Sequence, residues 1–167
     1  MDKIWAPWRM QYIDKADKGT GCIFCTFPEE QNDSDRLILF RGTHCYIILN
    51  AFPYSNGHLM VTPYRHAAEM EDLNDNEMLE IMQLTRMAIN ILKTAFCPDG
   101  FNMGVNMGRV AGAGIVGHIH VHIVPRWNGD TNFMPVIGDT RVIPESLQSV
   151  YKRLSELIVK LNENSDH

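Results

Sequence analysis

Five short runs along the chain are rich in apolar, β-branched and aromatic residues, a composition typical of β-strands. The segment Pro53-Tyr54-Ser55-Asn56-Gly57 indicates a turn before the third run, and Pro63 ends that run. We therefore expect five strands, at Leu37–Arg41, Thr43–Leu49, Gly57–Thr62, Phe101–Asn106 and His118–Val124.

Two other segments repeat apolar residues every three or four positions, the spacing of one helix face. The first helix is capped by Asn74 or Asp72 and is ended by Pro98 and Gly100. The second begins at Pro144, a residue suited to a first helical turn. The stripes expected to face the core are Met78, Ile81, Met82, Ala88, Ile89, Leu92 and Ala95 in the first helix and Leu147, Val150, Tyr151, Leu154, Leu157, Ile158 and Leu161 in the second.

The order of these elements is three strands, a helix, two strands and a helix. Short strands with hairpin-like spacing favour an α+β domain, in which helices cover one side of a five-stranded antiparallel sheet. We assign residues 21–163 to this domain. Residues 1–20 form an N-terminal arm that contains Trp5 and Trp8, and the polar residues 164–167 form a frayed tail.

Composition and charge narrow the class of protein. The 167 residues are 45% hydrophobic and 21% charged, as in globular domains. There is no apolar run long enough to span a bilayer and no secretory signal at the start, so we expect a cytoplasmic protein without a membrane partner. The net charge of −5 argues against a nucleic acid polymer as partner. A small phosphorylated ligand remains compatible, because it needs only a few local cations or N–H groups.

The four cysteines divide into a pair and two single residues. Cys22 and Cys25 form a C-x-x-C pair, which in a reducing compartment indicates metal binding or redox chemistry. Cys45 and Cys97 stand in or just after apolar runs, so we expect both to be buried as small hydrophobic residues.

The last expected strand carries the most informative pattern. Because side chains alternate along a strand, His118, His120 and His122 share one face while Ile119, Val121 and Ile123 face the core. Three neighbouring imidazoles are costly as packing alone, since each has two ring nitrogens to satisfy. Two functions explain them: a metal site, for which zinc is the best match, or nucleophilic catalysis by a neutral imidazole that carries a phosphoryl or nucleotidyl group.

The surroundings of this strand favour nucleophilic catalysis. A glycine-rich segment, Gly108 to Gly117, comes directly before the histidines, and its backbone N–H groups can approach an anion closely. By itself this loop could be only a hairpin connection. The strand contains no carboxylate that would complete an ordinary catalytic zinc site.

The run His-Ile-His-Val-His-Ile-Val-Pro at 118–125 resembles the signature of the histidine triad (HIT) family. The resemblance extends from about Gly21 to Arg126 and includes the C-x-x-C pair, Asn50, Gly57-His58 and the segment from Pro63 to His66. It implies an α+β domain that dimerises into a continuous sheet. It also implies a hydrolase or transferase that acts on nucleotides bearing a substituted phosphate.

The resemblance assigns roles to individual residues. His120 would be the nucleophile that attacks the α-phosphorus, and water or phosphate would then release the nucleotide. His122 and His58 would lie near the α-phosphate, with His122 assisting in proton transfer or orientation. The substrate contacts would come from Asn50 at the ribose and from Asn106, Gly112 and Gly114 at the phosphates. The alternative for Asn50 is a residue that only ends a strand and starts a turn.

A second set of residues matches the structural zinc site of part of the family. These are Cys22, Cys25, His66 and His118, whose types suit a tetrahedral Cys₂His₂ site. Such a site would leave His120 and His122 for chemistry. The alternative is that His118 serves the active site, as in members that lack the cysteines; His44 is a weaker substitute ligand. No organic cofactor is expected.

One departure from the family pattern concerns the substrate. Many hydrolytic members carry a glutamine where this chain has Gly114, and the glycine resembles bacterial members related to diadenosine tetraphosphate phosphorylases. The segment 125–133 also resembles that subgroup, and within it Arg126 and Asn132 either contact phosphates or are solvated loop residues. We expect turnover of dinucleoside polyphosphates, with water or phosphate as the acceptor. The alternatives are a nucleotide-binding module with little catalysis and a zinc-dependent hydrolase.

Overall fold

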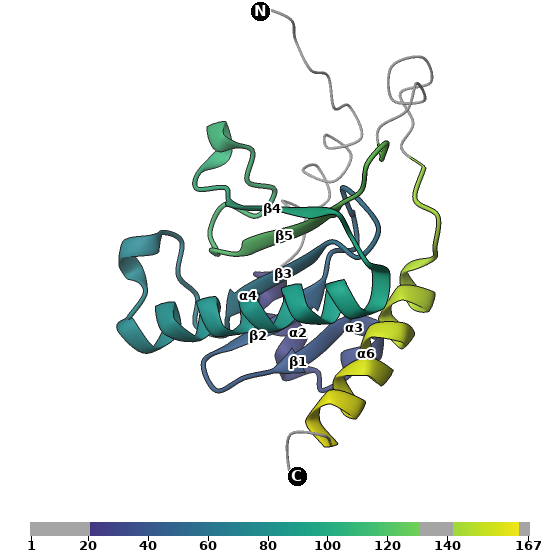
Figure 1. The fold of residues 1–167 in the computed structure, drawn as a ribbon. Coiled ribbons are helices and arrows are strands. Elements are labelled where there is room, and N and C mark those ends of the chain that lie inside the picture. The colour runs from purple at the N-terminus through teal and green to yellow at the C-terminus, as the bar shows by residue number, and fades with distance from the viewer. Residues whose placement is uncertain (1–20, 131–141, 164–167) are drawn as a thin grey trace, which may run out of the picture.

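A computed structural model describes residues 21–130 and 142–163 of the chain. The expected arm at residues 1–20, the tail at 164–167 and Asn132 lie outside these residues. Five strands form one antiparallel sheet in the order β1-β2-β3-β5-β4 (Figure 1), which confirms the expected fold class. The strands are β1 (Ile38–Arg41), β2 (Cys45–Leu49), β3 (Leu59–Pro63), β4 (Gly100–Val105) and β5 (Val121–Arg126).

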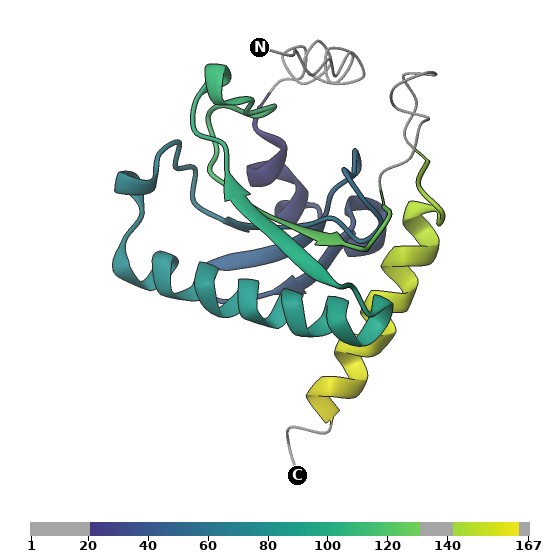
Figure 2. The same ribbon diagram turned by 45° about the horizontal axis from the view of Figure 1, so that its top comes forward.

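Two long helices cover one side of the sheet, as expected. Helix α4 (Asp75–Phe96) packs on β2, β3 and β5, and α6 (Leu147–Glu163) packs on β1 and α4. The shorter α2 (Ile23–Glu29) and α3 (Asp33–Arg36) were not anticipated from the sequence. Figure 2 shows α2 and α4 on opposite sides of the sheet. Two short 3₁₀ turns, η1 (Met70–Asp72) and η2 (Arg109–Ala111), complete the described elements.

Alternation along the strands divides the buried side chains into two layers. Ile47, Leu59 and Ile123 belong to the larger core beneath α4 and α6. Tyr46, Ile48 and Met60 form a smaller core with Phe24 of α2 on the opposite side. Because β3 pairs with β5 so that Met60 faces His122, the histidines of β5 lie on the side covered by α2.

Several details of the expected pattern are wrong, among them the start of α6, which is Leu147 and not Pro144. β5 begins at Val121, so His118 and His120 precede the strand, although the Ile119 N–H still bonds to the Ala67 carbonyl at 2.7 Å. Met78 and Met82 on α4 are 43% and 59% exposed, and Leu84 and Ile91 fill the core instead. Cys45 is buried as expected, but Cys97 is exposed, because α4 ends there in a left-handed turn with φ 46°.

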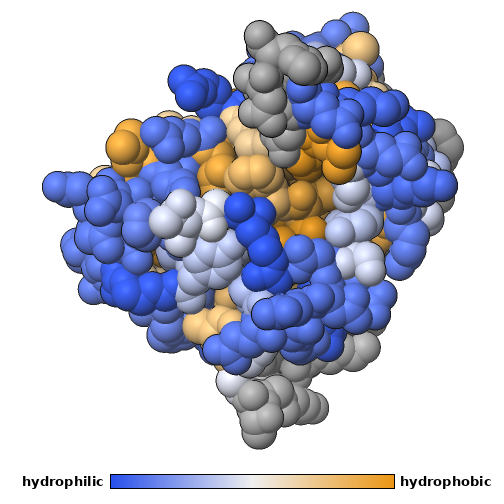
Figure 3. Space-filling model, turned by 90° about the horizontal axis from the view of Figure 1, so that it is seen from below, coloured by the Kyte–Doolittle hydropathy of each residue, from blue (hydrophilic) through white to orange (hydrophobic). Residues whose placement is uncertain are grey.

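The described surface agrees with the charged composition. On the face drawn in Figure 3, hydrophobic side chains gather in one area and hydrophilic residues cover most of the remainder. Within residues 21–130 and 142–163, no helix has the length and apolar character needed to cross a membrane.

Glu77 connects the start of α4 to the segment after β3. Its carboxylate is 3% exposed and accepts two hydrogen bonds from the Arg65 guanidinium and one from the Asn74 N–H. The Arg65 hydrogen bonds hold the pKa of Glu77 below its ordinary value of 4.5. The stabilisation is therefore fully present above the ordinary carboxyl pKa and is lost as the pH falls through the lowered folded-state pKa.

We expect Glu77→Gln to lower the free energy of unfolding by about 1–3 kcal/mol at neutral pH, because the charged acceptor of the Arg65 donors is lost. Urea denaturation at several pH values from 7 to 3 measures the free energy of unfolding. The difference in this free energy between wild type and variant should shrink as the pH falls. The exposed Glu71→Gln is the control. A difference in unfolding free energy that stays constant with pH would contradict a stabilising role for the ionised Glu77 carboxylate.

Candidate active site and metal centre

A row of aromatic rings follows the α2 side of the sheet from its N-terminal helix to the β2–β3 turn. The Phe24 ring contacts those of His118 and His120, with centroids 5.4 and 4.9 Å away. His120 contacts His122 at 4.8 Å, and His122 contacts His58 at 5.1 Å. The structure thus brings the expected histidines into one row, and all four are at most 9% exposed.

The backbone fixes the hydrogen position on His120. Its Nδ1 lies 2.8 Å from the His118 carbonyl oxygen, which can only accept a hydrogen bond, so Nδ1 carries the hydrogen. Burial lowers the pKa of His120 below 6.5, although the hydrogen bond to His118 partly opposes this. The neutral ring then has a lone pair on Nε2, which is the form required of a nitrogen nucleophile.

A chain of donors and acceptors gives His122 the opposite tautomer. The Tyr54 N–H donates to His58 Nδ1 at 3.1 Å, so the hydrogen of neutral His58 is on Nε2. That Nε2 lies 3.0 Å from His122 Nδ1, which therefore accepts. The remaining ring nitrogen of His122, Nε2, carries the hydrogen. Two neighbouring histidines thus present a lone pair and a proton donor.

The amide of Asn50 supports this chain. It follows β2, and its Nδ2 lies 3.4 Å from His58 Nδ1, as a second donor to that atom. Its Oδ1 accepts from the Phe52 N–H at 2.9 Å, so Asn50 also shapes the turn after β2. The turn role of Asn50 is therefore seen in the structure, and its expected contact with a ribose stays a prediction.

The expected phosphate-binding residues lie in the connection between β4 and β5. The pairing of β4 with β5 ends at Val105 and Val121, so Asn106 and His120 each lie one residue beyond the last pair. Gly112 has a φ of 89°, a conformation that favours glycine, and it ends η2. Gly114 is half-buried in the same loop. Arg126, a further expected phosphate contact, is instead paired with Asp130 at 2.6 Å and bonded to Asn102.

The four expected metal ligands come together at the start of α2. Their ligand atoms all lie within 4.8 Å of one another, so Cys22, Cys25, His66 and His118 could hold a metal ion. His118 Nδ1 is 3.3 Å from Cys22 Sγ and 3.5 Å from Cys25 Sγ, and His66 Nδ1 is 3.4 Å from Cys25 Sγ. Bond lengths of about 2.3 Å to sulfur and 2.0–2.1 Å to nitrogen in a tetrahedral site place such atoms roughly 3.5 Å apart. His44 is not part of this group.

The tautomer of His118 also fits a metal ligand. Its Nε2 lies 2.9 Å from the Pro63 carbonyl oxygen and therefore donates, which leaves Nδ1 without hydrogen on the side of the two thiols. A metal-binding histidine commonly donates its second ring N–H to a carbonyl in this way. Burial lowers the pKa of His118 to about 4, which favours the neutral ring.

Two contributors to the site were missed from the sequence. Phe24 was seen only as a residue between the cysteines, but its ring lies against both His118 and His120. Tyr54 was seen only as part of a turn, but its N–H sets the His58 tautomer and its ring is 4.7 Å from that of His58. No sequence signal marked Phe24, because α2 has only seven residues and its N-cap, Cys22, makes no side-chain cap hydrogen bond.

Comparisons with known proteins identify the family. A model of the HIT domain matches residues 31–129, which is more than half of the chain. The chain belongs to the histidine triad family.

Among individual relatives, an AP-4-A phosphorylase of Mycobacterium tuberculosis is 40% identical over 163 residues, covering 93% of this chain and 83% of the relative. An adenosine 5'-monophosphoramidase of Schizosaccharomyces pombe is 28% identical, covering 82% and 98%. Among solved structures, a Zn-bound histidine triad protein from Mycobacterium smegmatis matches with a TM-score of 0.69 at 24% identity, covering 86% of this chain and 97% of the other. This last likeness shows a shared fold.

Proposed function

We propose that the protein cleaves dinucleoside polyphosphates of the diadenosine tetraphosphate type through a covalent bond between His120 and the nucleotide. The observation that carries the proposal is the hydrogen bond from His120 Nδ1–H to the His118 carbonyl, because it leaves the Nε2 lone pair for attack. The 40% identity to an AP-4-A phosphorylase supports the substrate class.

The first half-reaction uses the two histidines in opposite roles. The lone pair of His120 Nε2 forms a bond to the α-phosphorus while the bond from that phosphorus to the bridging oxygen breaks. The electron pair of the broken bond stays on the leaving nucleoside polyphosphate, whose oxygen accepts a hydrogen bond from His122 Nε2–H as its negative charge develops. The hydrogen-bond chain from Tyr54 through His58 supports this role of His122, since it keeps the hydrogen on Nε2.

The second half-reaction releases the nucleotide and restores the His120 ring. An oxygen of water or phosphate attacks the same phosphorus, and any proton on that oxygen is lost to solvent. The nitrogen–phosphorus bond breaks, and its electron pair returns to His120 Nε2. Water yields AMP and phosphate yields ADP, with ATP as the other product of diadenosine tetraphosphate in both cases.

Substrate contacts are proposed for the residues around the histidine row. Asn106 and the loop that contains Gly112 and Gly114 precede the histidines in the β4–β5 connection, and we assign to them an amide and backbone N–H groups for the phosphates. Asn50 would contact the ribose while it holds His58. The glycine at position 114 offers no side-chain amide to the leaving group, which favours the phosphorylase-like members of the family.

We also propose a structural zinc ion in the Cys₂His₂ group and a cytoplasmic homodimer. The distances of 3.3–3.5 Å between ligand atoms support zinc. The position of β4 supports the dimer: it is the last strand in the sheet order, and Met103 on it is 46% exposed. Pairing two such edges would extend the sheet across both copies.

Diadenosine tetraphosphate incubated with and without phosphate tests the activity. We expect ATP with AMP in water, and ATP with ADP where phosphate is the acceptor, separated by anion-exchange chromatography. His120→Asn removes the nucleophile and should lower kcat by at least roughly a thousandfold, with an unchanged melting temperature. Substantial turnover by this variant would refute the nucleophile, and nucleotide binding without product by wild type would favour a binding module.

Cys25→Ser should abolish stoichiometric zinc in the purified protein, measured by mass spectrometry of the metal. It should lower Tm by roughly 5–10 °C, because metal binding contributes to folding. Cys97→Ser, at an exposed thiol outside the group, is the matched control. If chelation abolished turnover of the folded protein and added metal restored it, a catalytic metal would replace the structural one.

Light scattering with size-exclusion chromatography tests the dimer. Wild type should elute at twice the chain mass, and Met103→Lys should shift it toward monomer, because a charge on an edge strand opposes pairing. Val159→Lys, at a 56% exposed position of α6, should remain dimeric. A monomeric wild type, or a Met103→Lys dimer as stable as wild type, would contradict pairing at β4.

A further inference from the structure

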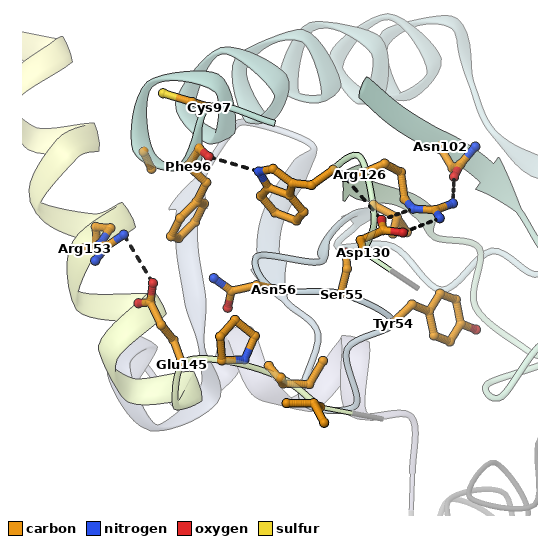
Figure 4. A pocket seen from close by; sticks show the side chains of 16 residues that line it. Tyr54, Ser55, Asn56, Phe96, Cys97, Asn102, Arg126, Asp130, Glu145 and Arg153 are labelled. Carbon is orange, nitrogen blue, oxygen red and sulfur yellow. Dashed lines mark hydrogen bonds and ion pairs between the residues drawn. The ribbon is translucent and has the colours of Figure 1, made fainter. Parts of the chain in front are cut away.

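A cavity of mixed polar and apolar lining lies at the end of the sheet, where β5 and the turn before β3 meet the ends of the long helices. It encloses about 820 Å³ and lies between the turn before β3, the end of α4, the end of β5 and the segment before α6. Figure 4 shows Tyr54, Asn56, Phe96 and Arg153 around it. This volume is typical of sites for small organic ligands.

The register of the sheet connects this cavity to the candidate active site. Residues two apart on β5 share a face, so Val124 and Arg126, which line the cavity, continue the row of His120 and His122. Four residues of strand place Arg126 roughly 13 Å from His122 along the chain. Several linked phosphates can cover that distance, and a single phosphate cannot.

Tyr54 forms part of the boundary between the two sites. Its side chain lines the cavity, while its ring lies 4.7 Å from the ring of His58 and 5.9 Å from that of His122. A ligand that occupied both sites would therefore pass this ring.

The side-chain amide of Asn56 is the strongest indication that the cavity binds a ligand. The residue is 8% exposed, and its Oδ1 is buried without a hydrogen-bond partner among the described residues. In Figure 4 the amide points into the cavity, between Phe96 and the segment before α6. A buried acceptor without a donor is costly, so it indicates a group that binds there.

The rest of the lining fits a nucleoside. Phe96, Trp127 and Tyr54 offer aromatic surface, on which a base can stack. Arg126 and Arg153 bring positive charge, each held by a carboxylate, of Asp130 and Glu145 respectively. A base with an exocyclic amino group supplies the donor that Asn56 Oδ1 lacks.

We propose that this cavity binds the second nucleoside of the dinucleoside polyphosphate, the one that departs with the leaving group. The proposal rests on the proposed function for the identity of the substrate. It assigns Asn56 to recognition of the departing base and Tyr54 to the boundary between the two halves of the substrate.

Binding to the inactive His120→Asn protein tests this without turnover. Isothermal titration gives Kd for diadenosine tetraphosphate and for adenosine tetraphosphate, which lacks only the second nucleoside. Adding Asn56→Leu should raise Kd for the two-nucleoside ligand roughly five- to tenfold, the value of one hydrogen bond, and change Kd for the other less than about twofold. Its melting temperature should not fall, because a buried acceptor without a donor is removed.

A second variant acts by volume. Val142 lines the cavity and is 60% exposed, so Val142→Trp can fill part of the space without disturbing the core. It should raise the same Kd selectively, whereas Met82→Ala on the exposed side of α4 should change neither value. Equal effects on both ligands, or no effect of Val142→Trp, would overturn the assignment. Failure of wild type to turn over either ligand would instead refute the proposed function.

Discussion

The hydrogen bond between His120 Nδ1 and the His118 carbonyl is the interaction on which the site depends. A carbonyl oxygen only accepts, so this 2.8 Å contact fixes the hydrogen on Nδ1 and the lone pair on Nε2. Because the donor and the acceptor are two residues apart in the segment before β5, the backbone itself sets the tautomer. Burial against Phe24 disfavours the imidazolium, which would have no lone pair to offer.

The same principle separates the neighbouring histidines by role. His118 donates from Nε2 to the Pro63 carbonyl and therefore directs Nδ1 to the thiols of Cys22 and Cys25. His122 accepts at Nδ1 from His58 and so carries its hydrogen on Nε2. Three residues of one type and one spacing thus present a nitrogen toward two thiols, a lone pair and a hydrogen-bond donor, because each meets a different partner.

The sequence predicted the sheet, the two long helices and the histidine row, because these depend on local periodicity. The prediction from sequence failed where tertiary contacts determine which side chains are buried and where short helices form. Met78 and Met82 fit the apolar spacing of α4 but lie on its exposed side, and Cys97 is exposed where α4 ends. Helix α2 was missed because it is short and carries Pro28 within it. The role of Tyr54 was not predictable, since a backbone N–H has no sequence signature. The family resemblance assigned the ligand group, and folding brings those four residues together.

Nitrogen-15 NMR of the imidazole rings tests the central claim most directly. Long-range proton–nitrogen correlations near neutral pH distinguish the two neutral tautomers from the imidazolium, and spectra of a His120 variant assign the signals. The structure requires the Nδ1–H form at His120 and the Nε2–H form at His122 in the same molecule. An Nε2–H tautomer or a charged ring at His120 would contradict the account.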